Sequence, residues 1–368
     1  MKKFKIAFFG SSAFVVPILD DLYKNQDSSL WKIFDLQLSW LKTNQQLFFD
    51  IVPNLLNFSL IDYSSVKELL ERPIELSLVV TQPDSYNHNK KISNPVLKFC
   101  SENNLSIFTP EKINKEIDSF KIKSQELDIS VVASFGQIIS QEILDIPKFG
   151  FINWHPSNLP NYRGATPMQT LLKNGDLETA LSWIEMSSGM DSGDVLLKLK
   201  TRVLETENFP TLAHRMGFFG ENTWAVAIVL NILSSFKKEN YKLKQNPIDA
   251  TFCKMLSKSD KILSIKDKTA LEIYNQWRAY LSFPGTSFLD VYFNGEVKIL
   301  QAKLDLKASK SSLEEHIVLF SDENWIQIRE LKEAKTFLRC KNDTYLEIKE
   351  ILLVSGKKIN FSGFVFKS

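Results

Sequence analysis

Asn153, His155 and Asp191 are side chains whose types and spacing could perform chemistry. Asn153 and His155 end the apolar run that starts at Phe151, which predicts a buried strand, and alternate residues of a strand share one face. Asp191 lies in the glycine-flanked acidic loop Gly189–Asp194, which could return a carboxylate to the strand end. Each residue taken alone also fits a structural role. An imidazole that moves protons, a carboxylate that orients it and an amide donor together suit acyl transfer.

The elements that must position these residues alternate between apolar strands and helices up to about residue 202. Expected strands are Phe4–Phe9, Leu76–Thr81, Ser106–Phe108, Leu127–Ser134 and Leu181–Met186. This alternation predicts βαβ units in a mostly parallel sheet, whose ligand crevice lies beyond the carboxyl ends of the strands. The amphipathic stretch Phe209–Ser235 is expected to close this first domain.

A second domain is expected after a charged linker. Residues 237–250 are rich in lysine and poor in apolar side chains, so we divide the chain into 1–236, the linker 237–250, and 251–368. The last part shows short alternating segments, and Asn294-Gly295 is a strong hairpin signal. Many short strands separated by turns predict a small β-barrel.

Residues 26–73 read as a strongly aromatic insert of helical or mixed structure. The first interpretation is an elaboration packed on the outer face of the first domain. A contact with a partner or with RNA is the alternative.

Composition excludes several classes of protein. The 368 residues are 44% hydrophobic and 24% charged, with a net charge of +2, which is typical of a globular protein and gives no global nucleic-acid signal. Three cysteines without metal-ligand spacing predict reduced thiols and no metal. No signal peptide and no run of 18 apolar residues is evident, so we expect a cytoplasmic protein without membrane contact. A monomer is a separate expectation, because the sequence itself gives no oligomeric state.

A longer pattern carries a family resemblance. Asn153-x-His155-x-Ser157-x-Leu159-Pro160-x-Tyr162-Arg163-Gly164, followed by Asp191-Ser-Gly-Asp194, resembles the signature of folate-dependent formyltransferases. Within that superfamily the chain is most similar to the methionyl-tRNA formyltransferase family. Further matching segments are Val80–Asp84, Pro110–Ile113, Phe135–Ile138, Lys254–Ile262 and Trp277–Gly285.

The resemblance implies a fold and a reaction. The fold is α/β, with a Rossmann-like, mostly parallel formyltransferase domain followed by a small OB-like β-barrel that binds tRNA. The reaction transfers a formyl group from 10-formyltetrahydrofolate to the α-amino group of the methionyl moiety on initiator Met-tRNA. Asn153 would donate to the oxyanion, His155 would polarise the formyl group and relay a proton, and Asp191 would orient His155.

Two segments match the family's folate pocket, which is lined largely by backbone and apolar contacts. Their residues are Ser157, Asn158, Leu159 and Pro160, together with Phe135, Gly136, Gln137, Ile138 and Ile139. Ile138 and Ile139 also fit a core role. The family usually has leucine at position 158 and proline at position 140, where this chain has Asn158 and Ser140. Both differences bear on folate affinity more than on chemistry.

The loop Ser85–Lys91 corresponds to a basic family loop that enters the acceptor end of tRNA. His88, Lys90 and Lys91 are the candidate contacts, and the family's arginine and glycines are missing. A solvated turn is an equal alternative. Arg163 is expected to be structural, bonding carbonyl groups under the active site.

Three other functions stay open at this point. A sugar-amine N-formyltransferase or a 10-formyltetrahydrofolate hydrolase would use the same first domain. An RNA-binding protein on this scaffold would need no chemistry, and the presence of all three polar residues argues against it.

Overall fold

The computed structural model describes residues 2–52, 66–87, 90–236, 241–305, 308–309, 312–313, 317–321, 323–330, 333–362 and 366. This part of the chain divides into two compact units. The first comprises Met1–Pro167, Glu178–Val203 and Ala213–Cys253, and the second comprises Met168–Leu177, Leu204–Leu212 and Lys254–Ser368. The predicted boundaries 1–236, 237–250 and 251–368 remain a prediction.

The first unit is built on an eight-stranded sheet in the order β2-β11-β10-β8-β7-β1-β3-β6. Its strands are β1 (Phe4–Gly10), β2 (Asp50–Val52), β3 (Ile74–Val80), β6 (Ile107–Phe108), β7 (Ile129–Ala133), β8 (Phe151–His155), β10 (Glu178–Glu185) and β11 (Val195–Arg202). The pairs from β8 to β6 are parallel, while β10 is antiparallel to both β8 and β11. The α/β architecture with a mostly parallel sheet is therefore confirmed, with an antiparallel extension beyond β8.

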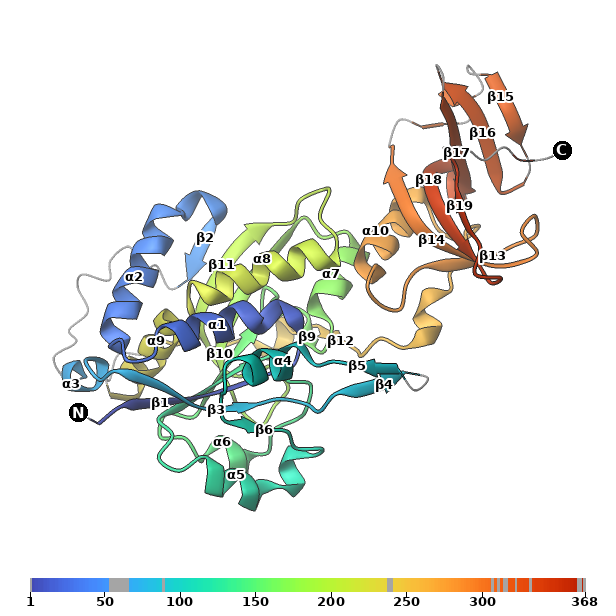
Figure 1. Ribbon diagram of the computed structural model, residues 1–368. Coiled ribbons are helices and arrows are strands. Elements are labelled where there is room, and N and C mark those ends of the chain that lie inside the picture. The colour runs from blue at the N-terminus through green and yellow to red at the C-terminus, as the bar shows by residue number, and fades with distance from the viewer. Residues whose placement is uncertain are drawn as a thin grey trace. The chain divides into compact units, whose positions relative to one another are not determined.

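Helices cover both faces of this sheet (Figure 1). They are α1 (Val16–Lys24), α2 (Leu30–Thr43), α3 (Lys67–Leu70), α4 (Pro95–Glu102), α5 (Ile117–Lys123), α6 (Gln141–Leu144) and α9 (Trp224–Phe236). On one face Phe120 of α5 and Ile143 of α6 join a core with Phe9 and other strand residues. On the other face α9 packs on β8, β10 and β11. Burial on both faces explains why Phe151, Ile152 and Trp154 of β8 are apolar, and every residue of this strand is buried.

The stretch predicted as one amphipathic element, Phe209–Ser235, forms two helices, α8 (Phe209–Glu221) and α9. Every residue from Trp224 to Leu233 is buried, so α9 is a core helix with no polar face. Within the described residues no single helix is long and apolar enough to cross a membrane, and α8 and α9 meet at a bend of 53°.

The aromatic region 26–73 is integrated into the first unit where it is described. Its helix α2 packs against α9, and β2 adds an edge strand that pairs with β11. Trp40 contacts the rings of Phe48, Phe218 and Phe219. Residues 53–65 lie outside the described part.

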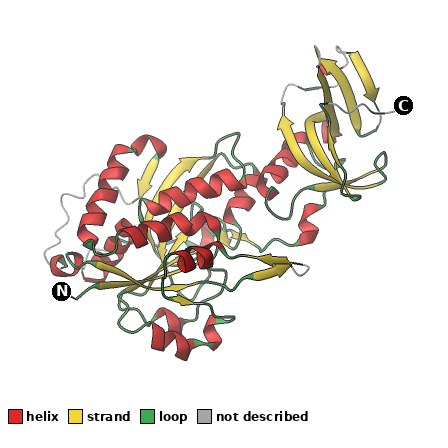
Figure 2. Cartoon of the chain, viewed as in Figure 1, coloured by secondary structure: helices red, strands yellow, loops and turns green. Residues whose placement is uncertain are grey.

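The second unit contains α10 (Ala270–Tyr280) and an antiparallel sheet in the order β13-β14-β18-β17-β16-β15, with β19 on β18 (Figure 2). Its strands are β13 (Ser287–Asp290), β14 (Gly295–Leu304), β15 (Ile317–Ser321), β16 (Trp325–Glu330), β17 (Glu333–Cys340), β18 (Thr344–Leu353) and β19 (Lys358–Asn360). Asn294 is the last residue of the turn after β13 and Gly295 is the first residue of β14, which pairs antiparallel with β13, as predicted. The described strands form an open path from β13 to β15, and the closed OB-like barrel stays a prediction. Helix α7 spans Pro167–Asn174. Its first residue, Pro167, is assigned to the first unit, and the rest of the helix is assigned to the second.

Candidate active site

The structure brings Asn153, His155 and Asp191 together at the carboxyl end of β8. Nδ2 of Asn153 donates to Oδ1 of Asp191 at 3.2 Å, and Nδ1 of His155 lies 3.6 Å from Oδ2 of Asp191. Oδ2 also accepts from the backbone N–H of Gly164 at 2.8 Å. Asp191 is thus the centre of the cluster. It links β8 to the Tyr162-Arg163-Gly164 turn.

His155 is held from two sides. Its side chain is 5% exposed, and Nε2 lies 2.9 Å from the carbonyl oxygen of Tyr162. Because a carbonyl can only accept, Nε2 carries the N–H in this pair, and Nδ1 is the nitrogen that faces the carboxylate of Asp191. A proton gained on Nδ1 would therefore lie next to a negative charge.

Two residues beside the histidine have a positive φ, a backbone conformation that residues other than glycine rarely adopt. Tyr162 has φ 61° and Asp191 has φ 46°. Such residues persist only where their surroundings hold them, and they cluster at functional sites. The loop also needs Gly193, since a Cβ there would lie 1.7 Å from the carbonyl oxygen of Glu185.

Sequence reasoning missed Gln245 and Thr251, which support the cluster. Gln245 lies in the predicted linker, and Thr251 is the first residue of the predicted second domain. Oε1 of Gln245 accepts from Nε and Nη2 of Arg163 at 3.1 and 2.8 Å, and its Nε2 donates to the carbonyl oxygen of Asp191 at 2.8 Å. Thr251 bonds both Tyr162 and Arg163. Arg163 is buried as a structural residue would be, but within the described part of the chain its guanidinium donates to the side-chain amide of Gln245 and not to backbone carbonyl groups. The local sequence Gln245-Asn246-Pro247 is typical of a polar linker and gives no sign that Gln245 supports the cluster.

The short strands β9 (Arg163–Gly164) and β12 (Phe252–Cys253) pair in parallel beside this cluster. A Cβ at Gly164 would lie 2.3 Å from the carbonyl oxygen of Cys253, so glycine is required for the pairing. Sγ of Cys253 accepts from the N–H of Thr166 at 3.3 Å. Burial first, and the Asp191 carboxylate to a lesser extent, raise the pKa of the Cys253 thiol.

The two predicted folate segments follow β7 and β8, which are parallel neighbours, so both leave the same edge of the sheet. After β8, Ser157 and Leu159 are buried, while Asn158 and Pro160 are partly exposed. Oγ of Ser157 donates to the carbonyl oxygen of Asn161 at 2.7 Å. The carbonyl oxygen of Leu159 accepts from Nζ of Lys198, whose pKa is lowered mainly by burial.

After β7 the predicted folate residues separate into three groups. Phe135 and Ile139 belong to the buried core, so only their backbone is available to a ligand. Gly136 is exposed and Ile138 is 77% exposed, which leaves an apolar side chain free at the sheet edge. Gln137 is occupied by the chain itself, since it bonds the backbone of Pro110 and Ile113.

The loop Ser85–Lys91 contains a hairpin of β4 (Ser85–Asn87) and β5 (Lys90–Ile92), where a polar loop was expected. His88 lies outside the described residues. Nζ of Lys91 lies 2.7 Å from Oδ2 of Asp84, whose Oδ1 accepts from the N–H of Asn94. The pKa of Lys91 is raised by this hydrogen bond and that of Asp84 is lowered by it. Lys91 therefore fixes the base of the hairpin.

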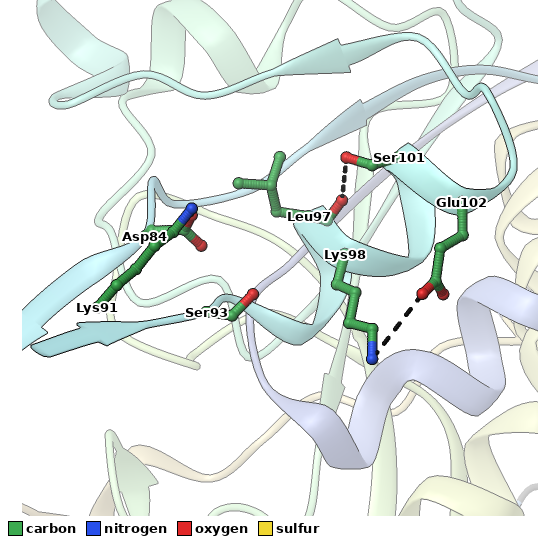
Figure 3. A pocket seen from close by; sticks show the side chains of 7 residues that line it. All are labelled: Asp84, Lys91, Ser93, Leu97, Lys98, Ser101 and Glu102. Atoms are coloured by element: carbon green, nitrogen blue, oxygen red, sulfur yellow. Dashed lines mark hydrogen bonds and ion pairs between the residues drawn. The ribbon is translucent and has the colours of Figure 1, made fainter.

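A pocket of about 380 Å³ lies between this hairpin base and α4. Figure 3 shows Lys91 beside Asp84, and Lys98 directed toward Glu102 at 3.8 Å. Both lysines of the pocket thus face carboxylates of the same chain. The pocket does not include the Asn153–His155–Asp191 cluster. Among the described residues, no group of three His, Cys, Asp or Glu side chains could hold a metal ion.

Comparison with known proteins places this arrangement in a family. A formyl transferase family model matches residues 56–230, and a model of the formyl transferase C-terminal domain matches residues 255–367. A methionyl-tRNA formyltransferase from Carboxydothermus hydrogenoformans is 31% identical over 79% of this chain and 88% of its own length. This chain belongs to the formyltransferase family.

Other formyltransferases extend the comparison. The methionyl-tRNA formyltransferases of Trichormus variabilis and Prochlorococcus marinus are 36% and 38% identical over 60% and 54% of this chain, and the matches span 66% and 63% of their own lengths. An N-formyltransferase from Helicobacter canadensis, solved with folinic acid and dTDP-3-aminofucose, has a TM-score of 0.53 at 15% identity, covering 98% of this chain and 100% of its own. A sugar 3N-formyl transferase, WlaRD, gives 0.51 at 20% identity, covering 95% and 97%. These solved structures support the fold.

Proposed function

We propose that this formyltransferase transfers the formyl group of 10-formyltetrahydrofolate to the α-amino group of methionyl initiator tRNA. The observation that carries the proposal is the convergence of Asn153, His155 and Asp191 at the end of β8. The relatives that match the chain across both its halves are named for this reaction. The C-terminal segments Lys254–Ile262 and Trp277–Gly285 resemble the tRNA-directed domain of the family, and this resemblance favours a tRNA substrate over a sugar amine.

In the proposed mechanism the amine nitrogen attacks the formyl carbon, and negative charge develops on the formyl oxygen. An amide nitrogen carries two N–H groups, and only one of those on Asn153 is used by Asp191. The other would donate to the oxyanion, a type of contact worth roughly 3 kcal/mol in the transition state.

The proton lost by the attacking amine would pass to Nδ1 of His155. Asp191 lies beside that nitrogen and would stabilise the imidazolium. When the bond between the formyl carbon and N10 breaks, the same proton would return to N10, so the histidine ends as it began. Tyr162 would keep the ring oriented throughout by accepting from Nε2.

The folate is expected to lie along the edge formed by the segments after β7 and β8. The exposed Ile138 and the partly exposed Asn158 and Pro160 are the side chains that would contact it. Phe135 and Ile139 would contribute only through backbone groups. This is a narrower set of side-chain contacts than the sequence pattern implied.

The test is formyl transfer to charged initiator Met-tRNA, followed by acid gel electrophoresis of the product. Uncharged tRNA, a nucleotide-linked amino sugar and water serve as the competing acceptors. We expect transfer to Met-tRNA alone. A faster reaction with the amino sugar, or formate release without any acceptor, would replace the proposal with one of the other two reactions.

A further inference from the structure

The side chain of Gln245 uses all of its hydrogen-bonding positions on the cluster. An amide oxygen accepts twice and an amide nitrogen donates twice. Oε1 accepts from Nε and Nη2 of Arg163, and Nε2 donates to the carbonyl oxygens of Asp191 and Gly193 at 2.8 and 2.7 Å. One side chain therefore joins the turn after β8 to the loop that carries Asp191.

Two residues lie against the ring of His155, Asp191 at Nδ1 and Tyr162 at Nε2. The backbone of each is hydrogen-bonded by the same segment, residues 245–251. Asp191, which faces Nδ1, has its backbone bound by Gln245. Tyr162, which faces Nε2, donates its N–H to Oγ1 of Thr251 at 2.9 Å. Both Asp191 and Tyr162 have positive φ, so both depend on their surroundings to keep this conformation.

We propose that Gln245 is a positioning residue for the reaction, which holds the carboxylate of Asp191 against Asn153 and His155. The inference rests on the proposed function for its kinetic readout. Gln245 touches neither the histidine ring nor the asparagine amide, so it acts through Asp191. Displacing a reacting group by about 1 Å can cost about a hundredfold in rate. Loss of Gln245 should therefore lower kcat while the KM for folate changes little.

A matched control separates this role from ordinary stabilisation. Gln37 also joins distant parts of unit 1, because its Nε2 donates to the carbonyl oxygen of Glu221 at 2.9 Å and its Oε1 accepts from the N–H of Ala225 at 2.8 Å. It lies in α2, in the aromatic region, and has no contact with the cluster. Gln37→Met and Gln245→Met remove similar sets of bonds with similar volume.

The experiment measures kcat, both KM values and the urea midpoint of the two methionine variants in the full chain. We expect Gln245→Met to lower kcat about 10- to 100-fold, and Gln37→Met to keep kcat within about twofold of wild type while its midpoint falls. Equal kcat values in the two variants would overturn the proposal.

A second variant shows which bonds of Gln245 matter. Gln245→Glu keeps an acceptor for Arg163 but places an oxygen against the carbonyl groups of Asp191 and Gly193. We expect it to be as slow as Gln245→Met. Turnover at the wild-type level would mean that the bond to Arg163 is sufficient, and the role assigned through Asp191 would be wrong.

A substrate-free readout keeps this inference distinct from the proposed function. With only 4 histidines in the chain, the ring signals of His155 can be assigned by NMR, with His155→Ala as the reference. Gln245→Met should shift those signals and Gln37→Met should leave them in place. Unshifted signals would refute the positioning role even in an active enzyme, whereas wild-type inactivity toward Met-tRNA would refute only the proposed function.

Discussion

At the scale of single residues, Asp191 has the most contacts in the cluster. Its two oxygens accept from Asn153 and from the N–H of Gly164, and one of them also faces His155. A carboxylate can only accept when ionised, so it matches donors on both sides. An amide at this position would present an N–H to one of these donors.

Asp191→Asn should accordingly lower kcat by about a hundredfold or more. The amide retains the shape of the side chain but opposes a donor with a donor and cannot stabilise an imidazolium. Steady-state kinetics with circular dichroism as a check on folding would measure the effect. Full activity throughout the neutral pH range would exclude the role of the carboxylate.

His155→Ala should show a loss of the same size, because it removes the group that carries the proton. The exposed His214 of α8 provides the matched control, since His214→Ala removes the same ring away from the cluster. We expect the control to keep wild-type turnover. Comparable losses in the two variants would indicate a general effect of histidine removal and not a catalytic one.

The buried thiols give a prediction about pH. Burial raises the pKa of Cys100 to about 11 and that of Cys340 to about 12, from an ordinary value of 9.0. The unfolded thiols lose protons first as pH rises, so the contribution to stability is complete below pH 9.0 and is lost as pH rises through the raised values.

The urea midpoint should therefore fall between pH 9.0 and about 11. The urea midpoint of the double variant Cys100→Ala, Cys340→Ala should fall less steeply over that pH interval, although this variant is less stable at neutral pH. Parallel pH curves for the two proteins would show that other groups cause the alkaline loss.

At the scale of elements, the strand that carries the cluster was predictable from local sequence. Phe151–His155 forms β8 because apolar residues fill a strand buried on both faces, and Asn153 and His155 follow from the alternation of side chains. The loop 189–194 was predictable as a partner because its glycines allow a tight return. Gly193 leaves no room for a Cβ.

Gly193→Ala should displace the loop and lower kcat by about tenfold or more, since a backbone carbonyl cannot move aside. Gly189→Ala is the control in the same loop. Its added Cβ would meet only the side chain of Ser192, at 2.2 Å from Oγ and 3.2 Å from Cβ, and the hydroxyl can rotate away. Turnover measured for both variants should differ clearly, and equal values would mean that the loop tolerates displacement.

Other elements could not be predicted from local sequence. Residues 241–253 were read as part of a linker and a following domain because they are polar and contain a proline. Their role depends on partners that are distant in sequence. Gln245 bonds Gly193, which lies 52 residues earlier, and Cys253 bonds Tyr162, which lies 91 residues earlier. The hairpin of β4 and β5 was likewise missed, since its polar strands lack the apolar alternation that indicates pairing.

The hairpin changes what is expected of its lysines. Each phosphate contact contributes a slope of nearly −1 in log K against log salt, so Lys90→Ala should flatten the dependence of Met-tRNA binding by up to about one unit. Lys91→Ala should also weaken the hairpin base, because Asp84 loses its partner. Asp84→Asn is the control that loosens the base without removing positive charge. An unchanged slope in both lysine variants would mean that this loop does not contact RNA.

At the scale of the whole molecule, the two units are interleaved in sequence. Met168–Leu177 and Leu204–Leu212 belong to the second unit together with Lys254–Ser368. Within that unit the buried Arg278 donates to Oδ1 of Asn275 and to the carbonyl oxygen of Glu207. A chain that ends before residue 254 therefore lacks the partners of two internal segments.

A fragment of residues 1–253 should unfold at a lower urea concentration than the intact chain, as measured by tryptophan fluorescence. Arg278→Met in the intact chain should reproduce part of this loss, because it removes the bonds to Glu207 and Asn275 without shortening the protein. Identical midpoints for the fragment and the intact chain would show that the internal segments need no partners from residues 254–368.

The proposed role of Gln245 implies an order of events during the synthesis of the protein. Gln245 lies 54 residues after Asp191. At ribosomal rates of about 5 to 20 residues per second, Asp191 is therefore synthesised about 3 to 11 s before Gln245. Asn153, His155 and Asp191 are all present in the growing chain during that interval, while the backbone of Asp191 lacks its donor. We therefore expect the cluster to reach the observed geometry only after the polypeptide has passed Gln245, when most of unit 1 has already been made.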